Sequence, residues 1–289
     1  MRRLRKRPLA LLLTSLLSAS PAPAPAPTPT RTPPKRVVSL NMCADQLVIA
    51  LADRSQIAGL TEWARDPELS FYADRAKNLP FTHRSAEEVL ERRPDLVIGA
   101  PFRTKDVLAP LKARGVTMLD LPRKDDLDGS EEAIRLVADA LGHPERGAAL
   151  IAAIHAQLAA VGAPPGHGRS AAYYQRQGYL TGTGTLVDDM MHRVGLVNIA
   201  ARLGRPELSQ IPLEQLALAR PDFVVTEEGT RAGEDRSGAM IRHPLLEAAV
   251  RPAHHLHIPQ ALTVCGGPGY PHAVALLADE IRHADRVTR

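Results

Sequence analysis

Two cysteines are the residues of this chain whose type most directly suggests chemistry. Cys43 follows a short apolar segment and opens a helical pattern, and Cys265 lies far along the chain in the glycine-rich run TVCGGP. A thiol at the start of a helix has a lowered pKa, which suits a nucleophile, and His83 or His272 would be the candidate base. The sequence has no GxSxG, P-loop or GxGxxG fingerprint. We therefore expect that the chain is not an enzyme and keep a cysteine-dependent enzyme as an alternative.

Histidines are numerous but their spacing does not indicate a metal site. His254, His255 and His257 cluster before a predicted strand, in an order unlike that of zinc fingers or HExxH helices. A solvated turn is the favoured interpretation. Asp188 and His192 lie one helical turn apart and are typical of a capped surface helix. We expect the protein to hold no cofactor of its own.

Short apolar strands alternate with helical patterns in both halves of the chain. This alternation predicts parallel sheets covered by helices on both faces. The strands are expected at residues 36–40, 57–61, 95–99 and 116–121, and again at 170–174, 222–226 and 256–258. Between the two sets, residues 130–160 have the pattern of one long helix or of two in tandem, with His143-Pro144 as the break.

An internal repeat relates the two halves. The segment EEVLERRPDLVI at 87–98 resembles EQLALARPDFVV at 214–225: in each, a glutamate opens a helix, Arg-Pro-Asp follows at the same offset, and an apolar strand comes next. Convergence is the alternative, since Pro commonly ends helices, but the matched glutamate favours duplication. The fold class that we predict is α/β, with two lobes, each a parallel sheet flanked by helices, joined by one long helix.

Composition and charge restrict the functions to consider. Hydrophobic residues make up 44% and charged residues 24%, as in globular proteins. The net charge of +4 comes from the first seven residues, five of which are basic, so it does not indicate a nucleic-acid partner.

The N-terminal segments predict export and five regions in the chain. Residues 1–20 have a basic start and a short leucine-rich run that is too short to span a bilayer, which indicates a signal peptide rather than a membrane anchor. Residues 21–35 form a Pro-rich linker with polyproline II character. The regions that we expect after these are an N-terminal lobe at 36–128, a connecting helix at 129–162 and a C-terminal lobe at 163–289.

From residue 36 onward the sequence resembles the class III periplasmic binding proteins, which bind cobalamin, ferric siderophores or haem between two lobes joined by a rigid helix. The resemblance rests on the order and spacing of RVVSLNMCADQL, IAGLTEW, SAEEVLERRPDLVIG with its partner PLEQLALARPDFVVT, and TGTLVDDMMHRVGLVNIA. It implies a periplasmic, monomeric protein that captures a small-molecule metal chelate. The metal would arrive within the chelate, and the chelate would pass to the permease dimer of an ABC importer in the inner membrane. A ligand sensor with the same lobes is a further alternative.

The resemblance also implies that one acidic residue on each lobe docks onto arginines of the permease. The matching positions are Glu87 and Glu214. Two charged contacts, one on each lobe, set orientation and encounter rate more than affinity. Stabilisation of a helix N-terminus is the alternative role for both carboxylates.

Ligand contacts are expected where strands end, because ligands of two-lobed α/β proteins lie at the carboxyl ends of the strands. The candidates are Asn41, Cys43, Trp63, Arg65, Arg84 and Arg103 in the first lobe, and Tyr174, Arg176, Cys265 and Tyr270 in the second. Trp63 offers a flat apolar face, or else lies in the core. The four arginines suit an anionic ferric siderophore, which we favour over cobalamin and haem.

The family layout places Cys43 and Cys265 on opposite lobes, facing the same cleft. Three interpretations remain open at this point: a disulfide, thiolates that contact the metal of the ligand, or small residues without a chemical role.

Overall fold

The computed structural model describes residues 32–83, 85–99, 105–122, 125–205, 207–228, 243–249 and 254–288. All helices and strands below lie in one compact unit, Pro33–Arg289. The predicted signal peptide and most of the Pro-rich linker lie outside the described residues. Among the helices in these ranges, none has the length and apolar character needed to cross a membrane.

The N-terminal lobe is a five-stranded sheet in the order β3-β2-β1-β4-β5, and every neighbouring pair is parallel. Its strands are β1 (Val37–Ser39), β2 (Ile57–Thr61), β3 (Phe81–Thr82), β4 (Leu96–Gly99) and β5 (Thr117–Asp120). Its helices are α1 (Met42–Leu51), α2 (Ala73–Ala76), α3 (Ala86–Glu91) and α4 (Lys105–Ala113). Strands β1, β2 and β4 are buried along their whole length, which explains why they read as apolar runs rather than alternating patterns.

The C-terminal lobe contains a four-stranded parallel sheet in the order β11-β10-β6-β8. Its strands are β6 (Ser170–Tyr173), β8 (Val197–Asn198), β10 (Phe223–Glu228) and β11 (His255–Pro259), with an antiparallel pair of β7 (Tyr179–Thr181) and β9 (Leu208–Gln210) beside them. Its helices are α7 (Leu186–Arg193), α8 (Ile199–Arg202), α9 (Leu213–Ala219), α10 (Pro244–Ala249) and α11 (Tyr270–Val287). Two parallel α/β lobes are therefore confirmed.

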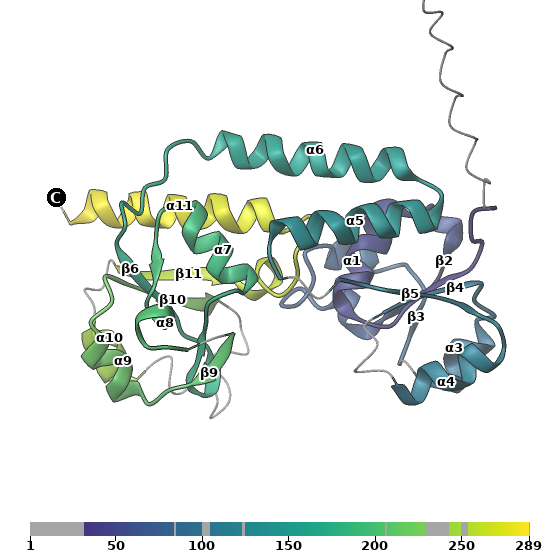
Figure 1. Cartoon of the computed structure of the whole chain (residues 1–289), viewed down its shortest axis with the longest axis horizontal. Coiled ribbons are helices and arrows are strands. Elements are labelled where there is room, and N and C mark those ends of the chain that lie inside the picture. Colours follow the sequence, from purple (N-terminus) through teal and green to yellow (C-terminus); the bar gives the residue numbers. More distant parts are fainter. Residues whose placement is uncertain are drawn as a thin grey trace, which may run out of the picture. The chain divides into compact units, whose positions relative to one another are not determined.

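The connection between the lobes contains two helices in tandem, which is one of the two alternatives that the sequence pattern allowed for residues 130–160. Helix α5 (Leu127–Leu141) ends at Gly142, whose φ of 81° is the left-handed conformation that closes many helices. Helix α6 (Pro144–Ala160) then begins with Pro144, which lacks the N–H that a first turn leaves unused. Helix α6 packs against α5 on one lobe and against α11 on the other (Figure 1), so it is the element that spans both lobes.

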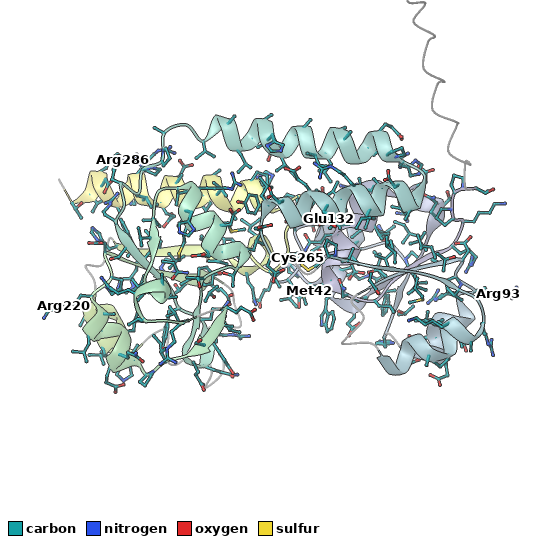
Figure 2. The ribbon with its side chains drawn as sticks, viewed as in Figure 1. Met42, Arg93, Glu132, Arg220, Cys265 and Arg286 are labelled. Carbon is teal, nitrogen blue, oxygen red and sulfur yellow. A yellow bond between two sulfur atoms is a disulfide. The ribbon has the colours of Figure 1, made fainter. Side chains whose placement is uncertain are left out.

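The internal repeat corresponds to the same structural unit in each lobe. Arg93 and Arg220 both adopt a φ of 46°, and both lie between a helix and the strand that pairs with the first strand of the lobe (Figure 2). Asp95 accepts hydrogen bonds of 2.7 and 2.9 Å from the backbone amides that lead into β1. Asp222 accepts bonds of 2.7 and 2.8 Å from the amide and hydroxyl of Ser170 at the start of β6. The Arg-Pro-Asp motif thus fixes two neighbouring strands in both lobes, as duplication predicts.

The largest hydrophobic core contains residues of both lobes. Leu47 of α1 and Ile134 of α5 belong to the same cluster of buried side chains as Ile154 of α6 and Val274 of α11. Apolar packing therefore continues from one lobe through the connecting helices into the other.

Candidate functional site

A disulfide between Cys43 and Cys265 joins the two lobes. Cys43 is the second residue of α1, directly after β1, and Cys265 follows β11 and the short 3₁₀ helix Gln260–Leu262. The Cα atoms are 5.3 Å apart although 222 residues separate the two cysteines in sequence. Cys265 and Met42, the neighbour of Cys43, lie between the two sheets in Figure 2. Of the three interpretations of the cysteine pair, the structure supports the disulfide, and a bonded Cys43 has no thiolate with which to attack a substrate or bind a metal.

The start of α1 is fixed by Asn41. Its side-chain oxygen accepts hydrogen bonds from the backbone N–H groups of Cys43, at 3.0 Å, and Ala44, at 2.8 Å. This is the geometry of an N-cap residue. Asn41 therefore positions Cys43 for the disulfide, and its side-chain oxygen is already used.

Asp45, in the first turn of α1, is a buried carboxyl group that the sequence analysis did not identify. It is fully buried and accepts hydrogen bonds from the backbone N–H of Thr61, at 3.0 Å, and from the Thr61 hydroxyl, at 2.5 Å. Burial raises the pKa of Asp45 from 3.8 to about 7, although the hydrogen bonds from Thr61 oppose the rise. The two residues tie α1 to the end of β2.

Trp63 and Arg65 lie in the 3₁₀ helix Glu62–Arg65 that follows β2, and both are half-buried. Trp63 therefore lies at a strand end, as predicted, and is neither a core residue nor a fully exposed one. The Arg65 guanidinium lies 4.1 Å from the centre of the Phe81 ring and donates to the Leu79 carbonyl at 2.5 Å. Arg65 thus has protein partners already.

His83 follows β3 and is oriented by a neighbouring carboxylate, whereas the sequence analysis considered it only as a candidate base for Cys43. Its side chain is 69% exposed, and its Nδ1 lies 3.1 Å from Oε1 of Glu88. The backbone N–H of His83 donates to Oε2 of the same carboxylate at 2.6 Å. These hydrogen bonds lower the pKa of Glu88. With Nδ1 as the donor, Nε2 has no hydrogen-bond partner within the part of the chain that the structure describes. Metal-ligating histidines commonly donate their second ring N–H to a carboxylate in this way.

The C-terminal lobe contributes a polar cluster next to the disulfide. The Tyr173 hydroxyl donates to Oγ1 of Thr263 at 3.0 Å and lies 3.4 Å from Oε1 of Glu227. Gln175 donates to the same carboxylate oxygen at 2.9 Å. Burial raises the pKa of Glu227, and the charge of Arg176 opposes that rise. Arg176 is half-buried, and its positive charge acts on the Glu227 carboxylate of its own lobe.

Two predicted ligand contacts are corrected by the structure. The side chains of Tyr174 and Tyr270 are fully buried, so neither is at a ligand surface. The Tyr174 hydroxyl donates to the carbonyl of Ile211 at 3.3 Å, and the Tyr270 hydroxyl donates to Asp189. Burial of these large rings supplies core area, and the hydrogen bonds satisfy their hydroxyls.

Two of the predicted arginines, Arg84 and Arg103, lie outside the described residues. The predicted cluster of four ligand-facing arginines therefore stays a prediction. Of the two that are described, Arg65 lies over the Phe81 ring, and the charge of Arg176 opposes the rise in the pKa of Glu227.

Glu87 and Glu214 occupy equivalent, exposed positions. Glu87 lies in the first turn of α3 and Glu214 in the first turn of α9, and each helix leads into an Arg-Pro-Asp motif. Four residues further along α9, Leu218 is 83% exposed. The two carboxylates are therefore accessible on both lobes, which is the geometry that the docking hypothesis requires.

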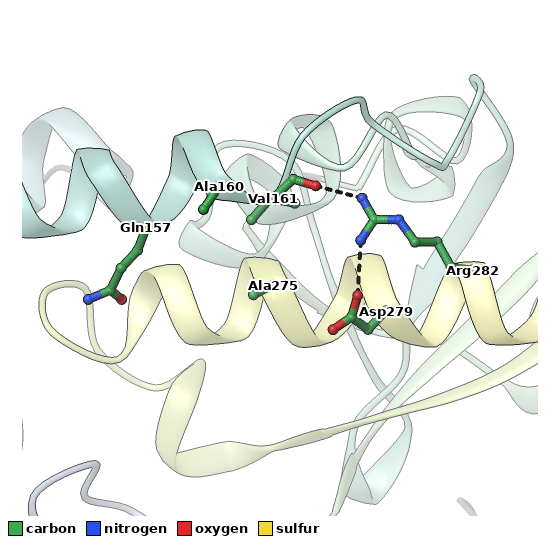
Figure 3. Close-up of a pocket in the computed structure, with 6 residues that line it drawn as sticks. All are labelled: Gln157, Ala160, Val161, Ala275, Asp279 and Arg282. Atoms are coloured by element: carbon green, nitrogen blue, oxygen red, sulfur yellow. Dashed lines mark hydrogen bonds and ion pairs between the residues drawn. The ribbon is translucent and has the colours of Figure 1, made fainter.

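A small hollow between α6 and α11 lies away from the strand ends. Its volume is about 160 Å³, and Figure 3 shows its lining: Gln157, Ala160, Val161, Ala275, Asp279 and Arg282. Arg282 donates to the Val161 carbonyl at 2.6 Å and pairs with Asp279 at 2.9 Å. Ligand sites are usually at least about 300 Å³, so we interpret this hollow as a gap in the packing between two helices. No group of three metal-ligating side chains was found within the described ranges.

Residues 37–260 match the family model described as "Periplasmic binding protein". A cobalamin-binding protein of Halobacterium salinarum is 26% identical over 201 residues, which cover 67% of this chain and 54% of that protein. The chain thus spans about half the length of this curated relative.

Two solved haem-binding proteins have similar structures. The periplasmic haem-binding protein RhuT of Roseiflexus sp. RS-1 has a TM-score of 0.71 and 28% identity, with coverage of 86% of this chain and 98% of that one. A periplasmic haem-binding protein of Pseudomonas aeruginosa has a TM-score of 0.67 and 26% identity, with coverage of 86% and 93%. The matched family model, the two parallel lobes and the spanning helix agree with one another, and the chain belongs to the class III periplasmic binding proteins.

Proposed function

We propose that this protein is the substrate-binding subunit of an ABC importer and that it captures a metal chelate at the facing strand ends of its two lobes. Membership of the class III family supports this proposal, as do relatives that bind haem or cobalamin. The metal is part of the cargo, and the protein needs no resident cofactor to bind it. Export to the periplasm and a monomeric state follow from the same proposal.

Haem is the chelate that the described residues favour. The observation that carries this choice is His83, which is exposed at the end of β3 and oriented through Nδ1 by Glu88. Haem iron accepts an axial imidazole ligand. The sequence favoured a ferric siderophore because of four arginines. Of the two that are described, Arg65 lies over the Phe81 ring and the charge of Arg176 acts on Glu227.

In this proposal each of these residues has a separate role in binding the chelate or the permease. Nε2 of His83 binds the iron of the cargo, and Glu88 holds the imidazole in the orientation that coordination needs. Trp63 offers an apolar face to the flat ring at the neighbouring strand end. The exposed carboxylates of Glu87 and Glu214 remain outside the site and contact the permease.

Titration of the purified full-length protein tests the choice of cargo. Haemin binding is followed by the Soret absorbance, and binding of cyanocobalamin and ferrichrome by the fluorescence of the single tryptophan, Trp63. We expect saturable, submicromolar haemin binding that weakens at least tenfold in His83→Ala. His283→Ala is the matched control, because His283 is an exposed histidine of α11.

Each other result identifies a different cargo or none. Saturation by cyanocobalamin alone would replace haem with the second candidate, which the Halobacterium relative supports. Saturation by ferrichrome alone would restore the siderophore. If calorimetry detects no binding of any of the three, the chelate proposal is wrong.

A further inference from the structure

The segment Cys265–Gly269 of the C-terminal lobe packs against α1 and Phe71 of the N-terminal lobe and against α5 of the connection. A Cβ atom at Gly266 would lie 1.9 Å from Oγ of Ser130 in α5. A Cβ at Gly267 would lie 3.4 Å from Leu47 of α1, and a Cβ at Gly269 would lie 3.5 Å from Phe71. We call this contact the interlobe seam. At Gly266 no side chain would fit. The glycines therefore let the backbone of one lobe approach the other closely.

Aromatic packing extends the interlobe seam. The rings of Phe71, before α2, and His272, in the first turn of α11, have centroids 5.0 Å apart. Leu47 and Tyr270 belong to the same buried cluster. Leu47 and Tyr270 are buried, whereas Phe71 is half-buried and His272 is exposed, so the seam has a buried apolar part and a solvent-accessible rim. Opening the seam would expose apolar surface of both lobes.

The disulfide crosses this seam. Cys43 follows Asn41 at the end of β1, and Cys265 follows Thr263, which accepts a hydrogen bond from Tyr173 at the end of β6. A covalent bond at this position links the strand ends of one lobe directly to those of the other. Helix α6 provides a second, separate connection along α5 and α11.

We propose that the Cys43–Cys265 disulfide sets the separation of the two lobes, which the helical connection does not set alone, so that the ligand enters a site of preset width. Two connections, one covalent at the seam and one through α6, suppress hinge rotation more than either does alone. This lock also fixes the distance between Glu87 and Glu214, one on each lobe. This property concerns the lobes themselves and does not depend on which chelate is bound.

Distances between spin labels on the two lobes test the lock. The labels are placed on noncanonical side chains at Glu91 and Leu218, which are exposed and lie four residues after Glu87 and Glu214 on α3 and α9. This chemistry leaves both cysteines in their disulfide. We expect the oxidised protein to give one narrow distance distribution, with the same mean before and after haemin is added. The double variant Cys43→Ser/Cys265→Ser is expected to give a distribution at least about twice as wide.

Two results would overturn the lock. An equally narrow distribution in the double serine variant, with a native circular dichroism spectrum, would show that packing alone sets the separation. A mean distance that moves when haemin binds to the oxidised protein would show that the lobes close. The second result needs only the oxidised protein, so the test survives if the serine variant does not fold. If haemin is not the cargo, the Soret absorbance does not change. The distance distributions measured without haemin then still test the lock.

Discussion

Asp45 makes the free energy of unfolding decrease as the pH rises. Its pKa is raised from 3.8 to about 7 in the folded protein, because burial disfavours the carboxylate. The folded state therefore binds more protons than the unfolded state between these values. The contribution of Asp45 to stability is complete below about pH 4 and is lost as pH rises through 7. We expect this group to lower the free energy of unfolding by up to about 4 kcal/mol from pH 4 to pH 8.

Substitution of Asp45 by Asn isolates this effect. An amide is uncharged at every pH in this range and retains an oxygen for the Thr61 N–H. We expect that the free energy of unfolding of Asp45→Asn, measured with urea between pH 4 and pH 8, lacks the decrease that we assign to Asp45. Asp128→Asn, at an exposed site in the first turn of α5, is the control. Parallel curves for wild type and Asp45→Asn would contradict the assignment.

Glu88 is a positioning residue for His83 if haem is the cargo. Replacement of Glu88 by Gln keeps the shape of the side chain but removes the charge that orients Nδ1. Loss of such an orienting partner typically weakens metal affinity by about 10–100-fold. We expect that loss in Soret titrations of Glu88→Gln, with an altered Soret maximum. Glu91→Gln, an exposed change on the same helix, is expected to bind haemin like wild type, and equal affinities for all three proteins would exclude the role.

The crossing of α5 and α6 depends on one glycine. A Cβ atom at Gly147 of α6 would lie 2.6 Å from the Cβ of Ala138 in α5, where both residues are buried. Gly147→Ala gains roughly 1 kcal/mol of helix propensity but overpacks this crossing, which typically costs about 1–3 kcal/mol. We expect a net loss of stability in thermal unfolding. The double variant Gly147→Ala/Ala138→Gly restores room for one methyl group, so its loss is expected to be smaller than the sum of the two single losses. Strict additivity would show that the helices separate to accept the methyl group.

The sequence predicted elements well where local signals were strong. The parallel strands of both lobes and the paired Arg-Pro-Asp units are present, because buried apolar runs and proline stops are local features. The pattern over 130–160 allowed one helix or two in tandem, and the structure has two, separated by Gly142 and His143. The antiparallel pair β7–β9 was not predicted: its strands have three residues each and little apolar pattern.

The site was predicted less well than the fold because contact with a ligand depends on tertiary burial. Tyr174 follows a strand, as the rule for ligand contacts requires, yet its ring lies in the core. His83 gave no signal in sequence spacing, since the carboxylate that orients it lies across the start of α3. The disulfide was one of three interpretations, and only the distance between two residues 222 positions apart could decide among them.

The whole molecule repeats one unit twice, and this repetition gives it two equivalent carboxylates. Glu87 and Glu214 are exposed at the same place in each repeat, one on each lobe, and the disulfide and α6 connect the lobes that carry them. A pair of charges held at a fixed spacing selects a partner with positive charges at the same spacing.

Charge reversal at both positions tests this role. Because both carboxylates are exposed and neither is among the residues to which chelate binding is assigned, Glu87→Arg/Glu214→Arg is expected to keep the chelate affinity of the wild type in titrations. Uptake of the chelate by cells with the cognate permease is expected to fall at least tenfold, while each single reversal gives a smaller loss. Glu91→Arg/Glu280→Arg is the matched control, because it places the same charges at other sites on α3 and α11. If uptake survives the Glu87/Glu214 reversal, these glutamates serve only their helix N-termini, and the protein is then better explained as a ligand sensor than as a transport subunit.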